Sequence, residues 1–81
     1  MLHYVIYILH SMGWEMDNNV KINRIKIAMT QEQLAKNVGV TRQTIGLIEK
    51  GEYNPSLQLC VAIAKELNKT LDDLFWEVEN K

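Results

Sequence analysis

The chain has 81 residues, which is enough for one domain but leaves no room for a separate catalytic or sensor domain. Apolar residues make up 47% and charged residues 23%, so the chain is globular rather than disordered. The net charge of −1 means that any attraction to a polyanion must come from how the charges are distributed. A single cysteine excludes an internal disulfide and fits a reducing cytosol.

Residues 1–16 form an apolar extension that differs from the domain we expect over residues 17–81. The run from Leu2 to Leu9 is broken only by His3 and is too short to span a bilayer, which needs about 20 residues. It also lacks the basic start and small-residue cleavage site of a signal peptide. Its β-branched and aromatic content favours a short strand, with a short packed helix as the alternative. We expect it to cover an apolar patch on the domain or on a second copy, unless Met16 is the natural start.

A first helix is expected over residues 17–28. Asp17 or Asn18 would cap this helix. Its inward face would carry Val20, Arg24 and Ile27.

Residues 30–51 predict two short helices joined by a three-residue turn. Thr30 can cap the first helix, with Gln33 completing a capping box. Gly39 ends that helix in a left-handed conformation, and Thr41 caps the second. The apolar positions expected to face inward are Leu34, Ala35, Val38, Ile45 and Ile48. This is the pattern of a helix-turn-helix, whose second helix enters the major groove of DNA.

Two further helices are expected beyond Gly51. Pro55 lies near the first turn of the next helix and Ser56 caps it. In LQLCVAIAKELN, apolar residues occupy nearly every direction, which predicts a helix buried on most sides. Thr70 would cap a last short helix, LDDLF, with Asp73 at the capping-box position. The tail WEVENK would be a short strand or a frayed end.

The run TQEQLA…VGVTRQTI…IEKGEYNPSL closely resembles the Xre/phage-repressor family of bacterial DNA-binding domains, over about residues 20–76. The resemblance implies an all-α, compact five-helix domain like that of lambda repressor, usually in a homodimeric transcriptional repressor or regulator. Aligned without a gap, Arg24 matches an arginine that many members bury against the glutamate matching Glu49. Aligned with a gap, VKI would become a short strand. We prefer the ungapped alignment because it keeps a helix long enough to pack.

The second helix of the motif supplies the candidate DNA contacts. Arg42 can pair with guanine O6 and N7, and Gln43 with adenine N6 and N7. Leu47 would contact a thymine methyl group or contact nothing, and the sequence leaves both open. The resemblance implies base contacts at these three positions and a phosphate contact at Gln31. The residues expected to contact phosphate are Gln31, Thr41, Thr44 and Lys50.

The sequence offers no constellation expected of an enzyme. His3 and His10 are seven residues apart and far from Cys60, so we expect no metal site. Cys60 lies in an apolar helix and is expected to be a small core residue rather than a nucleophile. We therefore expect no catalytic residues, cofactor or small-molecule ligand.

Taken together, these features predict a sequence-specific DNA-binding transcriptional regulator, acting as a homodimeric repressor on an inverted repeat. We expect it in the cytoplasm, associated with the nucleoid and not with a membrane. The alternative is an antitoxin-like protein-interaction module whose DNA binding is autoregulatory, with residues 2–9 exposed for a partner. The dimer contact is expected at one end of the second motif helix. Its apolar surface would come from Tyr53, Leu74, Phe75, Trp76, Val78 and the run Tyr4–Leu9.

Overall fold

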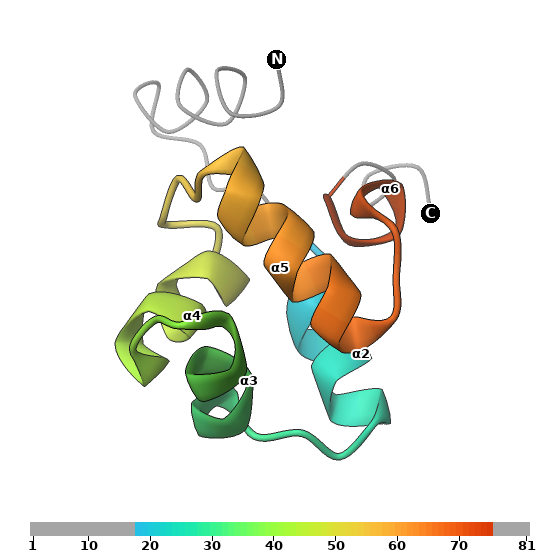
Figure 1. The fold of residues 1–81 in the computed structure, drawn as a ribbon, viewed down its shortest axis with the longest axis horizontal. Coiled ribbons are helices and arrows are strands. Elements are labelled where there is room, and N and C mark those ends of the chain that lie inside the picture. The colour runs from blue at the N-terminus through green and yellow to red at the C-terminus, as the bar shows by residue number, and fades with distance from the viewer. Residues whose placement is uncertain (1–17, 76–81) are drawn as a thin grey trace.

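A computed structural model describes residues 18–75, which form five α-helices and, over that range, no strand (Figure 1). The helices are α2 (Val20–Lys26), α3 (Gln31–Val38), α4 (Arg42–Glu49), α5 (Leu57–Leu67) and α6 (Leu71–Phe75). In Figure 1, α5 crosses the centre of the view, with α3 and α4 on one side and α2 and α6 on the other. The expected all-α, five-helix fold is confirmed. None of the helices between residues 18 and 75 has the length and hydropathy needed to cross a membrane.

Short polar side chains fix the starts of four helices, as expected; at α6 the Thr70 hydroxyl oxygen accepts the Asp73 backbone N–H over 3.1 Å. The hydroxyl oxygens of Thr30, Thr41 and Ser56 each accept a hydrogen bond from the backbone N–H three residues further on. Thr30 also completes its capping box, because its own N–H donates to Gln33 Oε1 over 2.9 Å. Gly39 follows α3 with φ of +81°, a left-handed conformation that glycine adopts at little steric cost. The short turn between α3 and α4 is therefore encoded locally.

A single apolar core joins all five helices. Its buried side chains are Val20, Leu34, Ala35, Ile45, Ile48, Cys60, Ile63, Ala64, Leu67, Leu74 and Phe75. Within it, burial raises the pKa of the Cys60 thiol from 9.0 to about 11, against a smaller lowering by a backbone hydrogen bond. Because the thiolate is the reactive form of cysteine, Cys60 behaves as a small apolar side chain at neutral pH.

The first helix is shorter than expected, and this changes what it buries. It begins at Val20 with Asn19 at its N-cap and ends at Lys26, rather than running over residues 17–28. Ile27 therefore lies beyond the last turn and is 49% exposed, so its predicted inward position is wrong. Asn23 faces inward instead, with Nδ2 donating to Asn19 O over 2.8 Å. The gapped alternative is also wrong, because Val20, Lys21 and Ile22 are helical.

The sequence predicted the exposure of three apolar side chains wrongly. Leu57 is 57% exposed, because it occupies the first turn of α5 and projects past the core. Leu74 and Phe75 are buried within the monomer, so they cannot supply the expected dimer contact. Pro55 lies directly before the Ser56 cap, next to the first turn of α5, as expected. The expectations for residues 1–16, for Trp76 and Val78, and for the tail fall outside residues 18–75.

Candidate nucleic-acid interface

A buried ion pair ties α4 to α2. Arg24 Nε donates to Glu49 Oε2 over 2.7 Å, and Arg24 Nη2 donates to Glu49 Oε1 over 3.2 Å. Arg24 Nη1 also donates to the Met29 carbonyl oxygen over 2.7 Å, so the guanidinium is bonded on three of its nitrogens. The two side chains are only 9% and 3% exposed. The ion pair expected from the ungapped alignment is therefore present, and it fixes the C-terminal end of α4.

Two further contacts hold α4 in the same place. Ile45 and Ile48 bury their side chains in the core, as expected from their spacing. The Asn18 side chain donates from Nδ2 to the Ile48 carbonyl oxygen over 2.7 Å, bracing the last turn of α4 from the chain that precedes α2. Because one face of α4 is held by these contacts, its opposite face keeps a defined orientation toward solvent.

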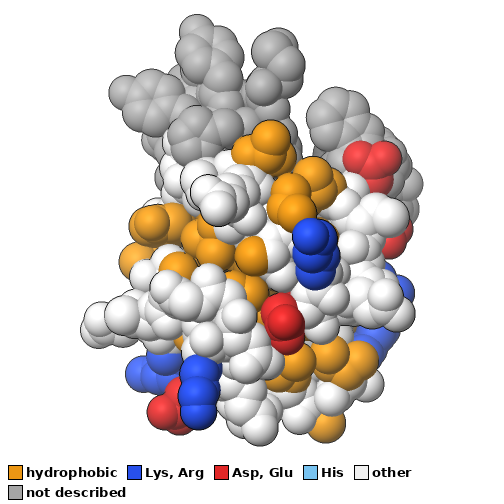
Figure 2. All heavy atoms as spheres, in the orientation of Figure 1, with side chains coloured by type: hydrophobic (Ala, Val, Ile, Leu, Met, Phe, Trp, Pro, Cys, Tyr) orange, Lys and Arg blue, Asp and Glu red, His pale blue; other side chains and the backbone are white. Residues whose placement is uncertain are grey.

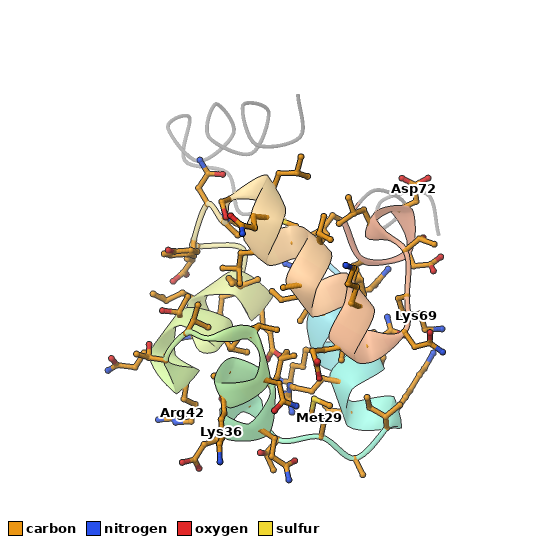
Figure 3. The ribbon with its side chains drawn as sticks, viewed as in Figure 1. Met29, Lys36, Arg42, Lys69 and Asp72 are labelled. Atoms are coloured by element: carbon orange, nitrogen blue, oxygen red, sulfur yellow. The ribbon has the colours of Figure 1, made fainter. Side chains whose placement is uncertain are left out.

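The outward face of α4 carries the residues predicted to read bases. Arg42 and Gln43 are exposed in its first turn, and Leu47 is 39% exposed one turn later. Arg42 extends away from the core at the end of the molecule formed by α3 and α4 (Figure 3). The three residues predicted to read bases therefore share one surface.

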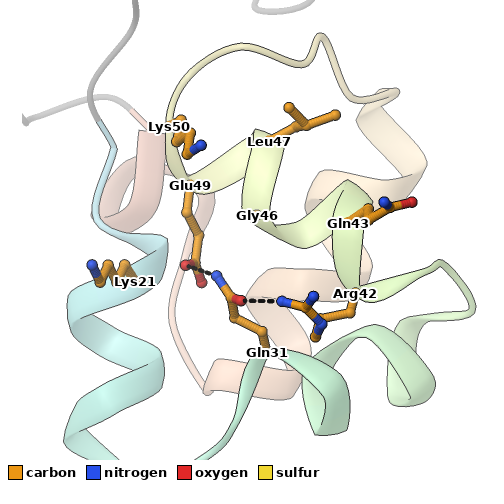
Figure 4. Close-up of a pocket in the computed structure, with 8 residues that line it drawn as sticks. All are labelled: Lys21, Gln31, Arg42, Gln43, Gly46, Leu47, Glu49 and Lys50. Carbon is orange, nitrogen blue, oxygen red and sulfur yellow. Dashed lines mark hydrogen bonds between the residues drawn. The ribbon is translucent and has the colours of Figure 1, made fainter.

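A shallow hollow of about 600 Å³ lies along this face (Figure 4). Five of the seven residues predicted to contact DNA line it, and Thr41 and Thr44 do not. The full lining is Lys21, Gln31, Arg42, Gln43, Gly46, Leu47, Glu49 and Lys50. Lys21 reaches this site from α2. The sequence did not predict this place for it, because the spacing of residues along the chain does not show how α2 lies against α4.

A chain of hydrogen bonds crosses the hollow from the buried ion pair to Arg42. Gln31 Nε2 donates to Glu49 Oε1 over 2.9 Å, and Arg42 Nη1 donates to Gln31 Oε1 over 3.3 Å. These bonds, drawn in Figure 4, set the orientation of the Gln31 amide. Its nitrogen has two N–H groups and uses one on Glu49, so a second donor is left for another acceptor. The sequence showed that Gln31 and Arg42 belong to one motif, but not that they touch.

The threonines beside the hollow pair with each other. Thr41 Oγ1 accepts the Thr44 backbone N–H over 3.2 Å, and the two hydroxyl oxygens are 3.0 Å apart. Since either hydroxyl can be the donor in that contact, the other hydroxyl proton is left to donate elsewhere. The pair therefore caps α4 and still offers one donor at its N-terminal end.

Comparison with known proteins matches residues 20–74 to the helix-turn-helix family. The chain belongs to the helix-turn-helix family. An uncharacterized HTH-type transcriptional regulator from Archaeoglobus fulgidus is 52% identical over 60 residues, which covers 74% of this chain and 86% of the relative. Another from Bacillus subtilis, YgzD, is 48% identical over 66 residues, covering 80% of this chain and 100% of the relative. These matches place the chain among the helix-turn-helix transcriptional regulators and confirm the family expected from the sequence.

A solved structure supports the same helix-turn-helix assignment. The restriction-modification controller protein C.AhdI from Aeromonas hydrophila superposes with a TM-score of 0.66 at 30% sequence identity. The likeness covers 70% of this chain and 86% of that chain. The arrangement of helices around α4 is therefore shared with a protein whose name describes a controller function.

Proposed function

We propose that this helix-turn-helix protein is a sequence-specific DNA-binding transcriptional regulator that acts as a homodimeric repressor on an inverted-repeat operator. The observation that carries the proposal is the division of α4 into two faces. Ile45 and Ile48 pack one face into the core and Glu49 anchors the C-terminal end of the helix, while Arg42 and Gln43 leave hydrogen-bonding groups exposed to solvent. A rigidly held helix with a free polar first turn is what insertion into a major groove requires.

Arg42, Gln43 and Leu47 are the residues proposed to read bases. The arginine and glutamine have the donor and acceptor geometry for guanine and adenine respectively, and both are exposed. Leu47 is exposed on the same face and presents methyl groups to a thymine methyl. Sequence discrimination would come from these three side chains, because the protein's net charge of −1 gives little general attraction to DNA.

Phosphate contacts are proposed for Gln31, Thr41, Thr44 and Lys50. Gln31 keeps one amide N–H, and the threonine pair keeps one hydroxyl proton, as described above. Lys50 is exposed just beyond the end of α4 and lines the hollow. Such contacts fix the position of α4 in the groove and carry no sequence information.

A dimer is proposed because one copy of α4 reads only a few base pairs. Two copies related by a two-fold axis must place their α4 helices about 34 Å apart to enter successive major grooves. The contact would then lie near the C-terminal end of α4, where Tyr53 is 40% exposed and Leu57 more so. Figure 2 shows apolar side chains over the N-terminal half of α5 and the loop before it. Occupancy of a promoter by such a dimer would exclude the polymerase.

The base-reading assignment is tested by Arg42→Ala and Gln43→Ala, with Lys50→Ala as the comparison. Each of the first two changes should cost about 1–3 kcal/mol on a duplex selected from a random pool, and relax preference at one or two base pairs. Their effect on random duplex DNA should be much smaller. Lys50→Ala should weaken binding to both duplexes evenly, because phosphates are the same in every sequence. Equal losses for Arg42→Ala and Gln43→Ala on selected and random DNA would refute base reading.

A further inference from the structure

Lys21 lies at the hollow but belongs to neither the motif nor the core. We propose that Lys21 binds a phosphate of the DNA backbone, so that α2 is a DNA-contacting element as well as the support of α4. This proposal rests on the proposed DNA binding and adds a contact from a helix outside the two-helix motif. The ligand is the phosphodiester of double-stranded DNA, and the contact is independent of sequence.

The position of Lys21 suits a phosphate rather than a base. Figure 4 shows Lys21 on α2, across the hollow from Arg42 and Gln43, with Glu49 between them. In this view the Lys21 side chain runs away from Glu49, so its ammonium group lies at the outer edge of the lining residues. Because a phosphate backbone runs along each side of the major groove, a helix that reads base edges has backbone on both flanks. A cation at the rim, on a neighbouring helix, therefore faces the backbone.

Helical geometry explains why Lys21 reaches this side. Lys21 and Arg24 are three residues apart on α2, and residues at that spacing share one side of a helix. The rotation of α2 that points Arg24 at Glu49 thus also brings Lys21 to the edge of the α4 surface. The Arg24–Glu49 pair and the bond from Asn18 to Ile48 fix α2 against α4. The backbone of Lys21 consequently has a defined place beside α4.

The charges around the hollow favour an anion. Glu49 is the one acidic residue that lines it, and its carboxylate is bonded by Arg24 through both oxygens. The cations at the rim, Lys21, Lys50 and Arg42, are therefore not neutralised by it. Within residues 18–75, Lys21 takes part in no ion pair, so its ammonium group can bind a phosphate without first breaking one.

The test compares Lys21→Gln with Lys26→Gln on random duplex DNA, which removes any need to know the operator. Both lysines are exposed on α2, but only Lys21 lines the hollow. In a plot of log affinity against log salt concentration, losing one phosphate contact should reduce the slope by about 0.9. The wild type should thus lose about three- to fourfold more affinity than Lys21→Gln between 50 and 200 mM salt. Lys26→Gln should keep the wild-type slope, and so should Lys21→Arg, which retains the charge.

Each other outcome has a definite meaning. An unchanged slope for Lys21→Gln, in a wild type that binds DNA, would overturn the Lys21 contact and leave the proposed function standing. An equal fall for Lys26→Gln would also overturn it, because the effect would then be one of general charge. A wild type without salt-dependent DNA binding would overturn the proposed function itself. Thermal unfolding of the variants shows whether a changed slope reflects binding rather than loss of fold.

Discussion

Arg24 has the most demanding environment of the basic residues between positions 18 and 75. Its guanidinium is almost removed from water, yet it meets a carboxylate and a backbone carbonyl with three of its nitrogens. A desolvated pair of this kind adds little net stability over an apolar pair, but removing one partner leaves the other charge buried and uncompensated. Glu49 would keep the hydrogen bond from Gln31, which is neutral and does not balance its charge.

We therefore predict that Arg24→Ala is far more destabilising than Lys26→Ala. The first change should lower the free energy of unfolding by about 3–5 kcal/mol, because it strands Glu49 in the interior. Lys26→Ala removes an exposed charge on the same helix and should change the free energy of unfolding by less than about 0.5 kcal/mol. Chemical denaturation of the two variants is the measurement. Matching midpoints would mean that the ion pair does not hold α2 to α4.

A pH-dependent prediction concerns Cys60. Its pKa is raised by burial to about 11 in the folded protein, so the folded state keeps its proton at a pH where the unfolded thiol loses it. The stability that comes from burying the neutral thiol is complete below pH 9.0 and is lost as the pH rises toward about 11. Cys60→Ala lacks this titration. The gap in denaturation midpoint between wild type and Cys60→Ala should therefore narrow between pH 7.5 and pH 10.5, and a constant gap would contradict the argument.

At the scale of the element, the helix starts were predictable because capping is local. Thr30, Thr41, Ser56 and Thr70 each bond the backbone three residues ahead, and that spacing is legible in the sequence. The end of α2 was not predictable in the same way. The chain leaves it through Ala28 with φ of +57°, where no glycine marks the turn. Because the sequence does not show that α2 ends at Lys26, it did not predict that Ile27 lies beyond the helix and is exposed.

The two glycines of the α3–α4 unit should respond to alanine in opposite directions. Gly39 has φ of +81° and open space around it, so Gly39→Ala should cost about 1–2 kcal/mol through backbone strain alone. Gly46 lies within α4, and a Cβ there would meet only Gln31 Nε2 at 3.8 Å, an ordinary contact. Gly46→Ala should thus stabilise the fold by about 0.5–1 kcal/mol through helix propensity. Chemical denaturation measures the midpoints of both variants. Midpoints that shift in the same direction would refute the predicted opposite effects.

At the scale of the whole molecule, sequence patterns predicted which helices form better than which apolar residues they expose. Leu74 and Phe75 looked available for a partner, but α6 packs them against the rest of the monomer. Leu57 looked buried, but its position in the first turn of α5 leaves it exposed. The place of Lys21 at the edge of the hollow was not predicted either. These exposures and the position of Lys21 depend on how helices distant in the sequence pack against one another. The periodicity of apolar residues within one helix carries no information about that packing.

The exposed apolar side chains near the C-terminal end of α4 give a prediction for self-association. Tyr53→Ser and Leu57→Ser should each weaken self-association by about tenfold, which corresponds to about 1.4 kcal/mol of lost apolar contact. The helical content should stay unchanged, because both side chains are already exposed in the monomer. Ile25→Ser is the matched control, since Ile25 is similarly exposed but lies on α2. Sedimentation across a concentration series measures all three. A wild type that stays monomeric at tens of micromolar, alone and on DNA, would refute the dimer.

The separation of the two faces of α4 also bears on how such proteins diversify. Arg42 and Gln43 are exposed and contribute no buried side chain to the core, whereas Ile45, Ile48 and Glu49 hold the helix. Under the proposed function, a substitution at either outward position alters the preferred operator and leaves the free energy of folding nearly intact. Successive substitutions at these positions can therefore change the target sequence while each variant remains folded. Duplicated genes built on this scaffold would be free to acquire separate regulatory targets.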